Sequence, residues 1–133
     1  MILVDTSVLI DWLKNIDNAK TQAFAVIVKT PSWGLSVLTY QELLQGVKHE
    51  SEYDSLKSYL ITQNIVYLPN TLDFYNAASG LYRTLRRNGE TIRSIADTLI
   101  ASTAIHNGYQ LLHNDKDFDV IAKYEPKLKI CQP

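Results

Sequence analysis

The chain has 133 residues, and its 13 Lys and Arg residues nearly balance its 14 Asp and Glu residues, for a formal net charge of −1. This length fits one domain over residues 1–133, with enough chain to bury a sizeable core. No apolar run reaches the roughly 20 residues that a bilayer span needs, so no membrane association is expected. The near-zero net charge predicts no general attraction to nucleic acid, so such an affinity has to come from local patches.

The N-terminus lacks the pattern of a signal peptide. No Lys or Arg precedes the first apolar run, and Asp5 and Asp11 interrupt it. Cys131 is the only cysteine, so no intrachain disulfide can form. Together these features predict a cytoplasmic protein in a reducing compartment.

Short apolar runs alternate with segments of helical periodicity along the chain. The first run, residues 2–4, leads straight to Asp5, and an apolar-periodic helix follows at once. Further strands are predicted at residues 33–38, 65–68, 109–113 and 128–131. Further helices are predicted at residues 19–30, 40–49, 52–63, 72–87 and 94–107, with a short one around Phe118 and Ile121. The alternation favours an α/β fold of three layers, in which helices cover both faces of a mostly parallel sheet of four to five strands.

Two segments have the S/T-x-x-acid pattern of a capping box, in which the first residue caps the N-terminus of a helix. One runs from Thr39 to Glu42, and the other from Ser94 to Asp97. Each is therefore predicted to start a helix.

Several aromatic and aliphatic side chains have the spacing of core residues. Trp12 and Tyr40 are expected to pack in the interior rather than to stack on bases. The helix at residues 72–87 has a stripe that is expected to face the core, made of Leu72, Tyr75, Ala78, Tyr82 and Leu85.

Four acids stand where strands or loops lead into helices. Asp5 directly follows the first strand, and Asp115 lies just after the fourth. Glu42 and Asp97 occupy the last positions of the two capping boxes. Taken singly, each acid has a structural explanation as a helix cap or a solvated turn residue.

Taken together, the four acids point to a metal site. Ligands bind outside the carboxyl ends of parallel strands, and the strands before Asp5 and Asp115 are candidates for neighbours. Carboxylates gathered at that edge repel one another unless a cation is present. An all-oxygen set suits Mg²⁺ or Mn²⁺, whereas a solitary cysteine and three histidines without ligand spacing disfavour zinc.

The same residues carry a resemblance to the PIN-domain nucleases, and among them to the VapC-like toxins of bacterial and archaeal toxin–antitoxin pairs. The matching motifs are Ile2-Leu3-Val4-Asp5-Thr6-Ser7-Val8-Leu9-Ile10, Leu38-Thr39-Tyr40-Gln41-Glu42-Leu43, Ile95-Ala96-Asp97-Thr98-Leu99-Ile100-Ala101 and Leu111-Leu112-His113-Asn114-Asp115-Lys116-Asp117-Phe118. Their order, their spacing and the total length all fit, and the resemblance covers nearly the whole chain.

The resemblance implies that Asp5, Glu42, Asp97 and Asp115 are the catalytic, metal-binding acids. Asp5 and Asp97 are the firmest ligands, and Glu42 either completes the metal shell or orients the attacking water as a base. Whether Asp115 or Asp117 is the fourth acid stays open.

Supporting groups are expected around these acids, namely Thr6, Asn114 and Asp117. The family's pattern has a Thr or Ser at the position that His113 occupies here. A hydroxyl that usually supports the site is therefore missing from this chain.

An activity and partners also follow from the resemblance. It implies a metal-dependent endoribonuclease that cuts a structured RNA such as tRNA and leaves 5′-phosphate and 3′-hydroxyl ends. Such hydrolysis needs a water made nucleophilic near neutral pH, which one or two carboxylate-bound divalent ions supply. It further implies a homodimer and a cognate antitoxin that docks on the protein and blocks the acids.

Four cationic residues are candidates for binding the RNA backbone. Arg93 and Lys116 lie close in sequence to the metal-site acids and are the favoured phosphate contacts. Arg86 and Arg87 cluster at the end of the helix at residues 72–87. For each of them, solvated surface charge is the competing explanation.

Other functional classes fit less well. The acids are spread over four elements, unlike those of a phosphoacceptor domain, and no Gly-rich turn for a dinucleotide follows the first strand. An EF-hand loop starting at Asp115 fails, because Val120 occupies its Gly position and Pro126 its Glu position. The alternative that remains is a catalytically silent PIN-like module that binds RNA or protein and keeps the acids as caps.

Overall fold

A five-stranded parallel sheet forms the centre of the computed structural model, which describes all 133 residues. Its strands are β1 (Ile2–Val4), β2 (Trp33–Ser36), β3 (Asn64–Val66), β4 (Gln110–Leu112) and β5 (Lys129–Ile130). They lie in the order β3-β2-β1-β4-β5, and every pairing is parallel. The predicted α/β fold is confirmed.

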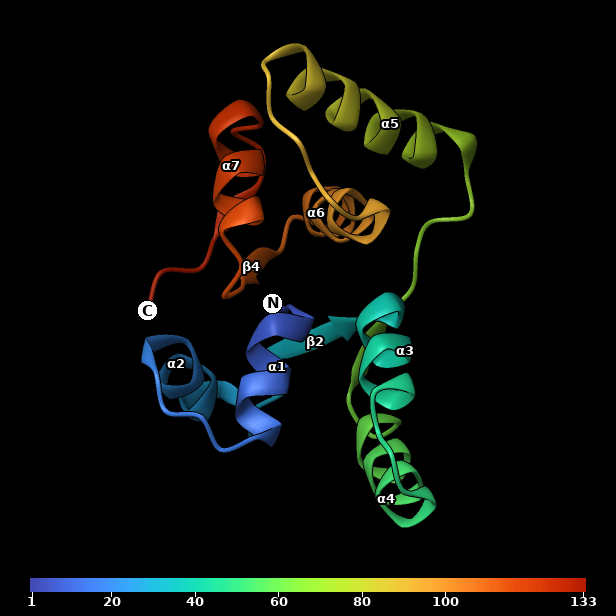
Figure 1. The fold of residues 1–133 in the computed structure, drawn as a ribbon, viewed down its shortest axis with the longest axis vertical. Coiled ribbons are helices and arrows are strands. Elements are labelled where there is room, and N and C mark those ends of the chain that lie inside the picture. The colour runs from blue at the N-terminus through green and yellow to red at the C-terminus, as the bar shows by residue number, and fades with distance from the viewer.

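Seven helices cover the two faces of this sheet. On one side lie α1 (Thr6–Leu13), α2 (Ala19–Ile27), α3 (Val37–Gln45) and α4 (Glu50–Leu60), and on the other α5 (Leu72–Arg87), α6 (Ile95–Asn107) and α7 (Lys116–Tyr124) (Figure 1). None of them combines the length and the apolar character needed to cross a membrane.

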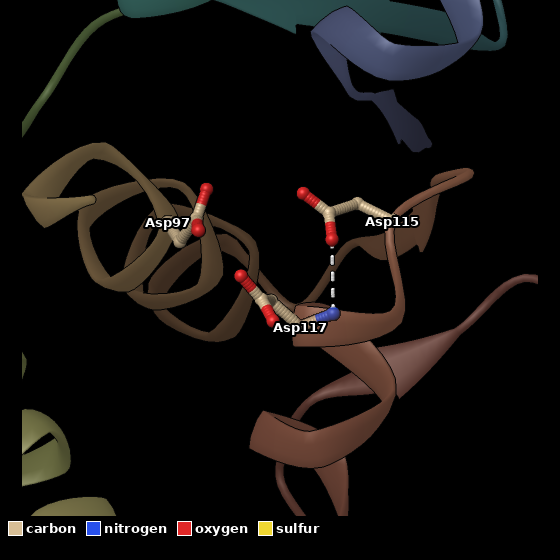
Figure 2. A group of neighbouring side chains, drawn as sticks. All are labelled: Asp97, Asp115 and Asp117. Carbon is tan, nitrogen blue, oxygen red and sulfur yellow. Dashed lines mark hydrogen bonds between the residues drawn. The ribbon is translucent and has the colours of Figure 1, made fainter. Parts of the chain in front are cut away.

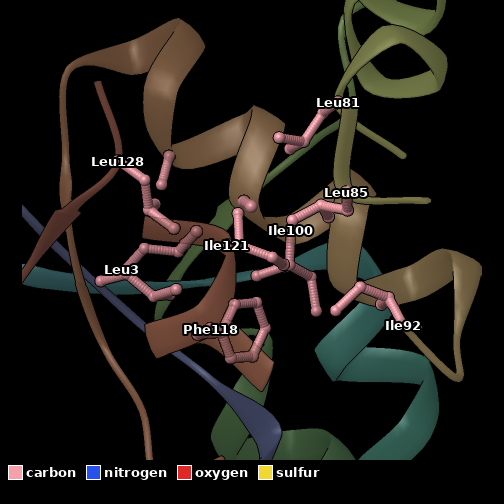
Figure 3. Packing of buried hydrophobic residues seen from close by; sticks show 11 residues of the cluster. Leu3, Leu81, Leu85, Ile92, Ile100, Phe118, Ile121 and Leu128 are labelled. Atoms are coloured by element: carbon pink, nitrogen blue, oxygen red, sulfur yellow. The ribbon is translucent and has the colours of Figure 1, made fainter. Parts of the chain in front are cut away.

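The central strands β1, β2 and β4 bury side chains on both faces, because successive side chains of a strand point to opposite sides and helices cover each side of the sheet. Leu3 and Leu111 belong to a cluster with residues of α5, α6 and α7 (Figure 3). Val4 and Leu112 belong to a second cluster, with residues of α1 to α4. Each sheet face thus has its own core, and the polar residues that follow β1 and β4 are left at the carboxyl ends of these strands.

The strand order defines where a ligand site can form. From β1 the chain builds outward through β2 and β3 on one side, while β4 and β5 extend the sheet on the other. The crevice of a parallel sheet opens where this direction reverses, between β1 and β4. Asp5 and Asp115 follow these two strands, which pair directly as predicted.

The capping box predicted from Thr39 to Glu42 is wrong about where its helix begins. β2 ends at Ser36, whose hydroxyl accepts the Leu38 N–H at 3.1 Å and caps α3. A short hydroxyl at the very end of the strand allows the helix to start three residues before the predicted position. Thr39 is consequently buried inside α3, and α3 ends at Gln45 rather than near residue 49.

The other element boundaries differ by a few residues. α4 begins two residues early, β3 begins one residue early and ends two residues early, and α7 starts at Lys116, two residues before Phe118. Ser94 caps α6 as predicted, with its hydroxyl accepting the Ala96 N–H at 3.1 Å.

The predicted apolar stripe of α5 is confirmed for Ala78 and Leu85 and wrong for its other three residues. Leu72, Tyr75 and Tyr82 are exposed, with Leu72 at 79%. The buried face consists of Phe74, Ala78, Leu81 and Leu85. Both sets have helical spacing, and packing against α6 selects the set without hydroxyl groups. Trp12 and Tyr40, by contrast, pack against the second cluster as expected.

Candidate active site

Asp5 is held rigidly at the end of β1. Its backbone N–H donates to the carbonyl of Leu112 at 2.9 Å, which ties it to β4. Its Oδ2 accepts the Ser7 backbone N–H at 3.0 Å and the Ser7 hydroxyl at 2.6 Å, so Asp5 caps α1. The side chain is buried, and this burial raises the pKa of Asp5 despite the Ser7 hydrogen bonds.

Asp115 and Asp117 come from the turn between β4 and α7. Asp115 caps α7, with Oδ1 accepting the Asp117 backbone N–H at 3.0 Å. Figure 2 shows both carboxylates directed towards Asp97 on α6. One carboxylate oxygen from each of the three residues lies within 4.8 Å of the other two. The structure thus brings Asp115 and Asp117 to Asp97 together.

Asp97 is the point at which the acids converge. It lies in the first turn of α6, and its carboxylate takes no part in the Ser94 cap. Its pKa is raised to about 7, first by burial and then by the charges of the four surrounding acids, Asp115, Asp5, Asp117 and Glu42. Five carboxylates therefore share one edge of the sheet, which none of their separate roles as caps explains.

Glu42 faces this edge from α3. The Thr6 hydroxyl donates to Oε1 of Glu42 at 3.2 Å and lies 3.0 Å from the hydroxyl of Thr39. Burial raises the pKa of Glu42, the Thr6 hydrogen bond opposes the rise, and the Asp5 charge adds to it. Glu42 and Asp5 lie outside the group of three whose oxygens meet within 4.8 Å.

The expected supporting groups differ in what they touch. Thr6 contacts Glu42, whereas the Asn114 side chain donates to Oδ2 of Asp11 at 3.0 Å rather than to an acid of the cluster. Asn114 reaches the site through its backbone instead, because its N–H donates to the Ser7 hydroxyl at 2.9 Å. Ser7 is the connecting group that the sequence reasoning missed. Its position two residues after a capping Asp was the available signal.

Among the four cationic candidates, only Arg93 contacts the acids. A terminal nitrogen of Arg93 lies 3.6 Å from Oδ2 of Asp117, while its side chain stays 74% exposed. Lys116 is exposed and forms no ion pair. Arg86 and Arg87 are exposed at the end of α5, where they line a separate hollow of about 400 Å³ with Arg83.

The donor set fits a hard divalent cation. All five converging groups are carboxylates, and oxygen ligands are those that Mg²⁺ and Mn²⁺ prefer. The buried histidine next to the site, His113, has both ring nitrogens engaged within the protein, so it is no ligand for zinc.

Comparison with known proteins identifies the family. Residues 2–124 match the model of the PIN domain, and the chain belongs to the PIN-domain family. Among its relatives, Ribonuclease VapC11 of Mycobacterium tuberculosis is 32% identical over 125 residues, which make up 92% of this chain and 92% of that protein. Ribonuclease VapC1 of Methanocaldococcus jannaschii is 30% identical over 128 residues, covering 96% of this chain and 85% of that protein. The resemblance to VapC-like proteins is confirmed.

A solved structure with low sequence identity to this chain confirms the fold. VapBC2 from Rickettsia felis, bound to a DNA fragment from its promoter, superposes with a TM-score of 0.76 at 20% identity. The match covers 98% of both chains. The fold described here is thus the PIN fold over nearly its whole length.

Proposed function

We propose that this chain is a divalent-metal-dependent endoribonuclease of the VapC type. The observation that carries the proposal is the convergence at Asp97, where the oxygens of three acids meet within 4.8 Å and the charges of two more reach the same carboxylate. The two relatives named above are ribonucleases, which supports RNA as the substrate class.

Asp97, Asp115, Asp117 and Asp5 are the residues proposed to hold the ion. When bound there, Mg²⁺ or Mn²⁺ supplies a water that is nucleophilic near neutral pH and neutralises charge on the phosphate oxygens. The backbone contacts of Asp5 and Asp115 hold their carboxylates in place before any ion binds. Such preorganisation limits the reorganisation needed at the moment of reaction.

Glu42 is the candidate for taking the proton of the attacking water. It is more exposed than Asp5, and the Thr6 hydroxyl orients one of its oxygens and leaves the other free. Its raised pKa brings it closer to the value that suits a general base near neutral pH.

Arg93 is the candidate for the first RNA phosphate contact. Its guanidinium bridges from Asp117 to solvent and is therefore placed to meet a phosphate beside the acids. Lys116, exposed next to Asp115, is the second candidate. The near-neutral charge of the whole chain favours a defined target such as a structured RNA, of which tRNA is our proposal, over binding along any strand.

An antitoxin is the proposed protein partner. A groove of about 570 Å³ runs between α1, α3 and α4, and its lining includes the apolar Ile10, Leu13 and Leu56 as well as Glu42. A partner segment in this groove reaches the acid cluster through Glu42 and thereby blocks it. The Rickettsia felis structure that superposes on this chain is itself a VapBC complex, which supports a partner of this kind.

A homodimer is proposed as the assembly state. The exposed side chains of Tyr75, Tyr82 and Ile95 line a groove of about 600 Å³ on α5 and α6, and Leu72 is exposed at the start of α5. Light scattering of the purified chain tests the proposal. A dimer that becomes monomeric in Tyr82→Glu supports it, and a monomeric wild type contradicts it.

The test of the enzymatic activity is to incubate the purified chain with total RNA and to map the cut ends. Cleavage with Mg²⁺ or Mn²⁺, and none with a chelator, is expected, with 5′-phosphate and 3′-hydroxyl ends. Asp97→Asn and Asp5→Asn should abolish cleavage and keep the circular dichroism spectrum.

Asp54→Asn is the matched control, because Asp54 is an exposed acid on α4 away from the cluster. It should cleave like the wild type. Metal-independent cleavage, or full activity in both site variants, would sink the proposal. Binding to RNA without any cleavage would instead favour the catalytically silent module.

A further inference from the structure

His113 lies between β4 and Asp115, and its side chain is only 2% exposed. Its two ring nitrogens have different partners. The backbone N–H of Asp115 donates to Nδ1 at 3.1 Å, and Nε2 lies 3.2 Å from Oδ1 of Asp119 on α7. The ring also packs on Phe118, with 5.2 Å between centroids.

These contacts select one tautomer of the imidazole. Because Nδ1 accepts the Asp115 N–H, it carries no proton, and the ring hydrogen therefore lies on Nε2, which donates to Asp119. The imidazole is thus fastened at both ends.

The contact with Asp115 has the form of a side-chain turn. In such turns a Ser, Thr, Asn or Asp side chain accepts the N–H of the residue two positions later. His113 makes the same i to i+2 contact with a ring nitrogen. The imidazole therefore supplies the acceptor that a Thr or Ser at this position would provide, so the missing hydroxyl leaves no unpaired N–H.

We propose that His113, with Asp119 behind it, is a positioning residue for Asp115. The inference rests on the proposed function, because it assigns His113 to the metal-holding carboxylate of that site. The ring fixes the Asp115 backbone at the point where its side chain turns towards Asp97 (Figure 2). Anchoring by Asp119 makes this position depend on α7 as well as on β4. A carboxylate held in this way binds an ion without first being ordered.

The test compares variants of the full-length chain by Mn²⁺ affinity, measured by isothermal titration calorimetry, and by kcat and KM on a cleaved RNA. His113→Ala removes the acceptor and is expected to weaken Mn²⁺ binding by about 10- to 100-fold, the range for residues that orient metal ligands. The loss should fall on kcat rather than on KM. His113→Asn offers an amide oxygen to the same N–H and should recover most of the affinity.

Asp119→Ala guards against a folding failure of His113→Ala, because the Asp119 side chain is 66% exposed. It should shift Mn²⁺ affinity in the same direction by a smaller factor, whereas Asp54→Ala, an exposed acid elsewhere, should not. In the metal-free wild type, nitrogen-15 NMR should find the ring proton on Nε2.

Three outcomes overturn the inference. The first is a proton on Nδ1. The second is wild-type Mn²⁺ affinity in both His113→Ala and Asp119→Ala. The third is failure of His113→Asn to recover affinity although it folds. If one of these outcomes occurs while the wild type binds Mn²⁺ and cleaves RNA, the inference about His113 is overturned and the proposed function stands. A wild type that binds no Mn²⁺ overturns both.

Discussion

The backbone N–H of Asp117 donates a hydrogen bond to Oδ1 of Asp115 across 3.0 Å. This contact caps α7 and also places two acids of one turn beside Asp97. A helix N-terminus favours nearby negative charge, so the start of α7 is a favourable place for an acidic side chain such as that of Asp115. Asp115 therefore serves both the cap of α7 and the candidate metal site, and a substitution of Asp115 tests both roles.

Neutralising either acid of this turn should lower the pKa of Asp97. The charges of Asp115 and Asp117 both raise that pKa, which is about 7 in the wild type. In Asp115→Asn and in Asp117→Asn it should fall, with the larger drop in Asp115→Asn, since its charge has the larger effect. Carbon-13 NMR titration of the metal-free protein measures it. An unchanged value in both variants would show that the three carboxylates are not close in solution.

The metal-free protein should lose stability as the pH rises towards 7. The Asp97 carboxyl has an ordinary pKa near 3.8 when unfolded and about 7 when folded. Between these values the folded state binds the extra proton, so the free energy of unfolding falls from about pH 4 to about pH 7 and then levels off. Asp97→Asn has no carboxyl group to titrate at this position and should therefore lack this loss of stability.

Above pH 7, the free energy of unfolding of metal-free Asp97→Asn should therefore be about 1 kcal/mol higher than that of the wild type. This figure allows for the solvent that screens a half-buried group. Urea unfolding at several pH values measures the difference, and Asp54→Asn controls for the loss of a surface charge. Equal pH profiles for wild type and Asp97→Asn would contradict the raised pKa.

Adding Mg²⁺ or Mn²⁺ should raise the melting temperature. An ion that binds only the folded state stabilises it by about 2.7 kcal/mol at 100 times its dissociation constant. Chelator should reverse the shift, and Mn²⁺ or Mg²⁺ titrated into Asp97→Asn should produce a much smaller one. An unchanged melting temperature of the wild type at millimolar Mn²⁺ would contradict this prediction.

Two glycine substitutions should change stability in opposite directions. A Cβ on Gly34 in β2 would lie 2.7 Å from the carbonyl oxygen of Asn64 on β3, so Gly34→Ala has to push the two strands apart. We expect it to cost about 1 to 3 kcal/mol. Gly80 in α5 has open space around the same position, and Gly80→Ala should stabilise by about 0.5 to 1 kcal/mol. Thermal unfolding of both variants checks the contrast, and a stabilising Gly34→Ala would refute the close approach.

The sequence alone was sufficient for the α/β alternation, the placement of acids after strands and the family. These depend on local pattern. A short apolar run that leads to Asp5 or to Asp115 predicts a buried strand with the acid beyond its carboxyl end, whichever elements pack around that strand. The start of α3 shows the limit of such reasoning. Ser36 and Thr39 are both good caps, and only the length of β2 decides between them.

Tertiary structure alone decided the geometry of the site. No pattern in the sequence distinguishes Asp115 from Asp117, and it is the turn into α7 that carries both to Asp97 on another helix. Likewise, the loss of a hydroxyl at His113 looked like a defect until the fold placed its ring against the Asp115 N–H and Asp119. Local spacing determines which residues can begin a helix or end a strand. Contacts between residues distant in sequence depend on how the packed layers bring separate elements together, and those contacts determine what the acids share.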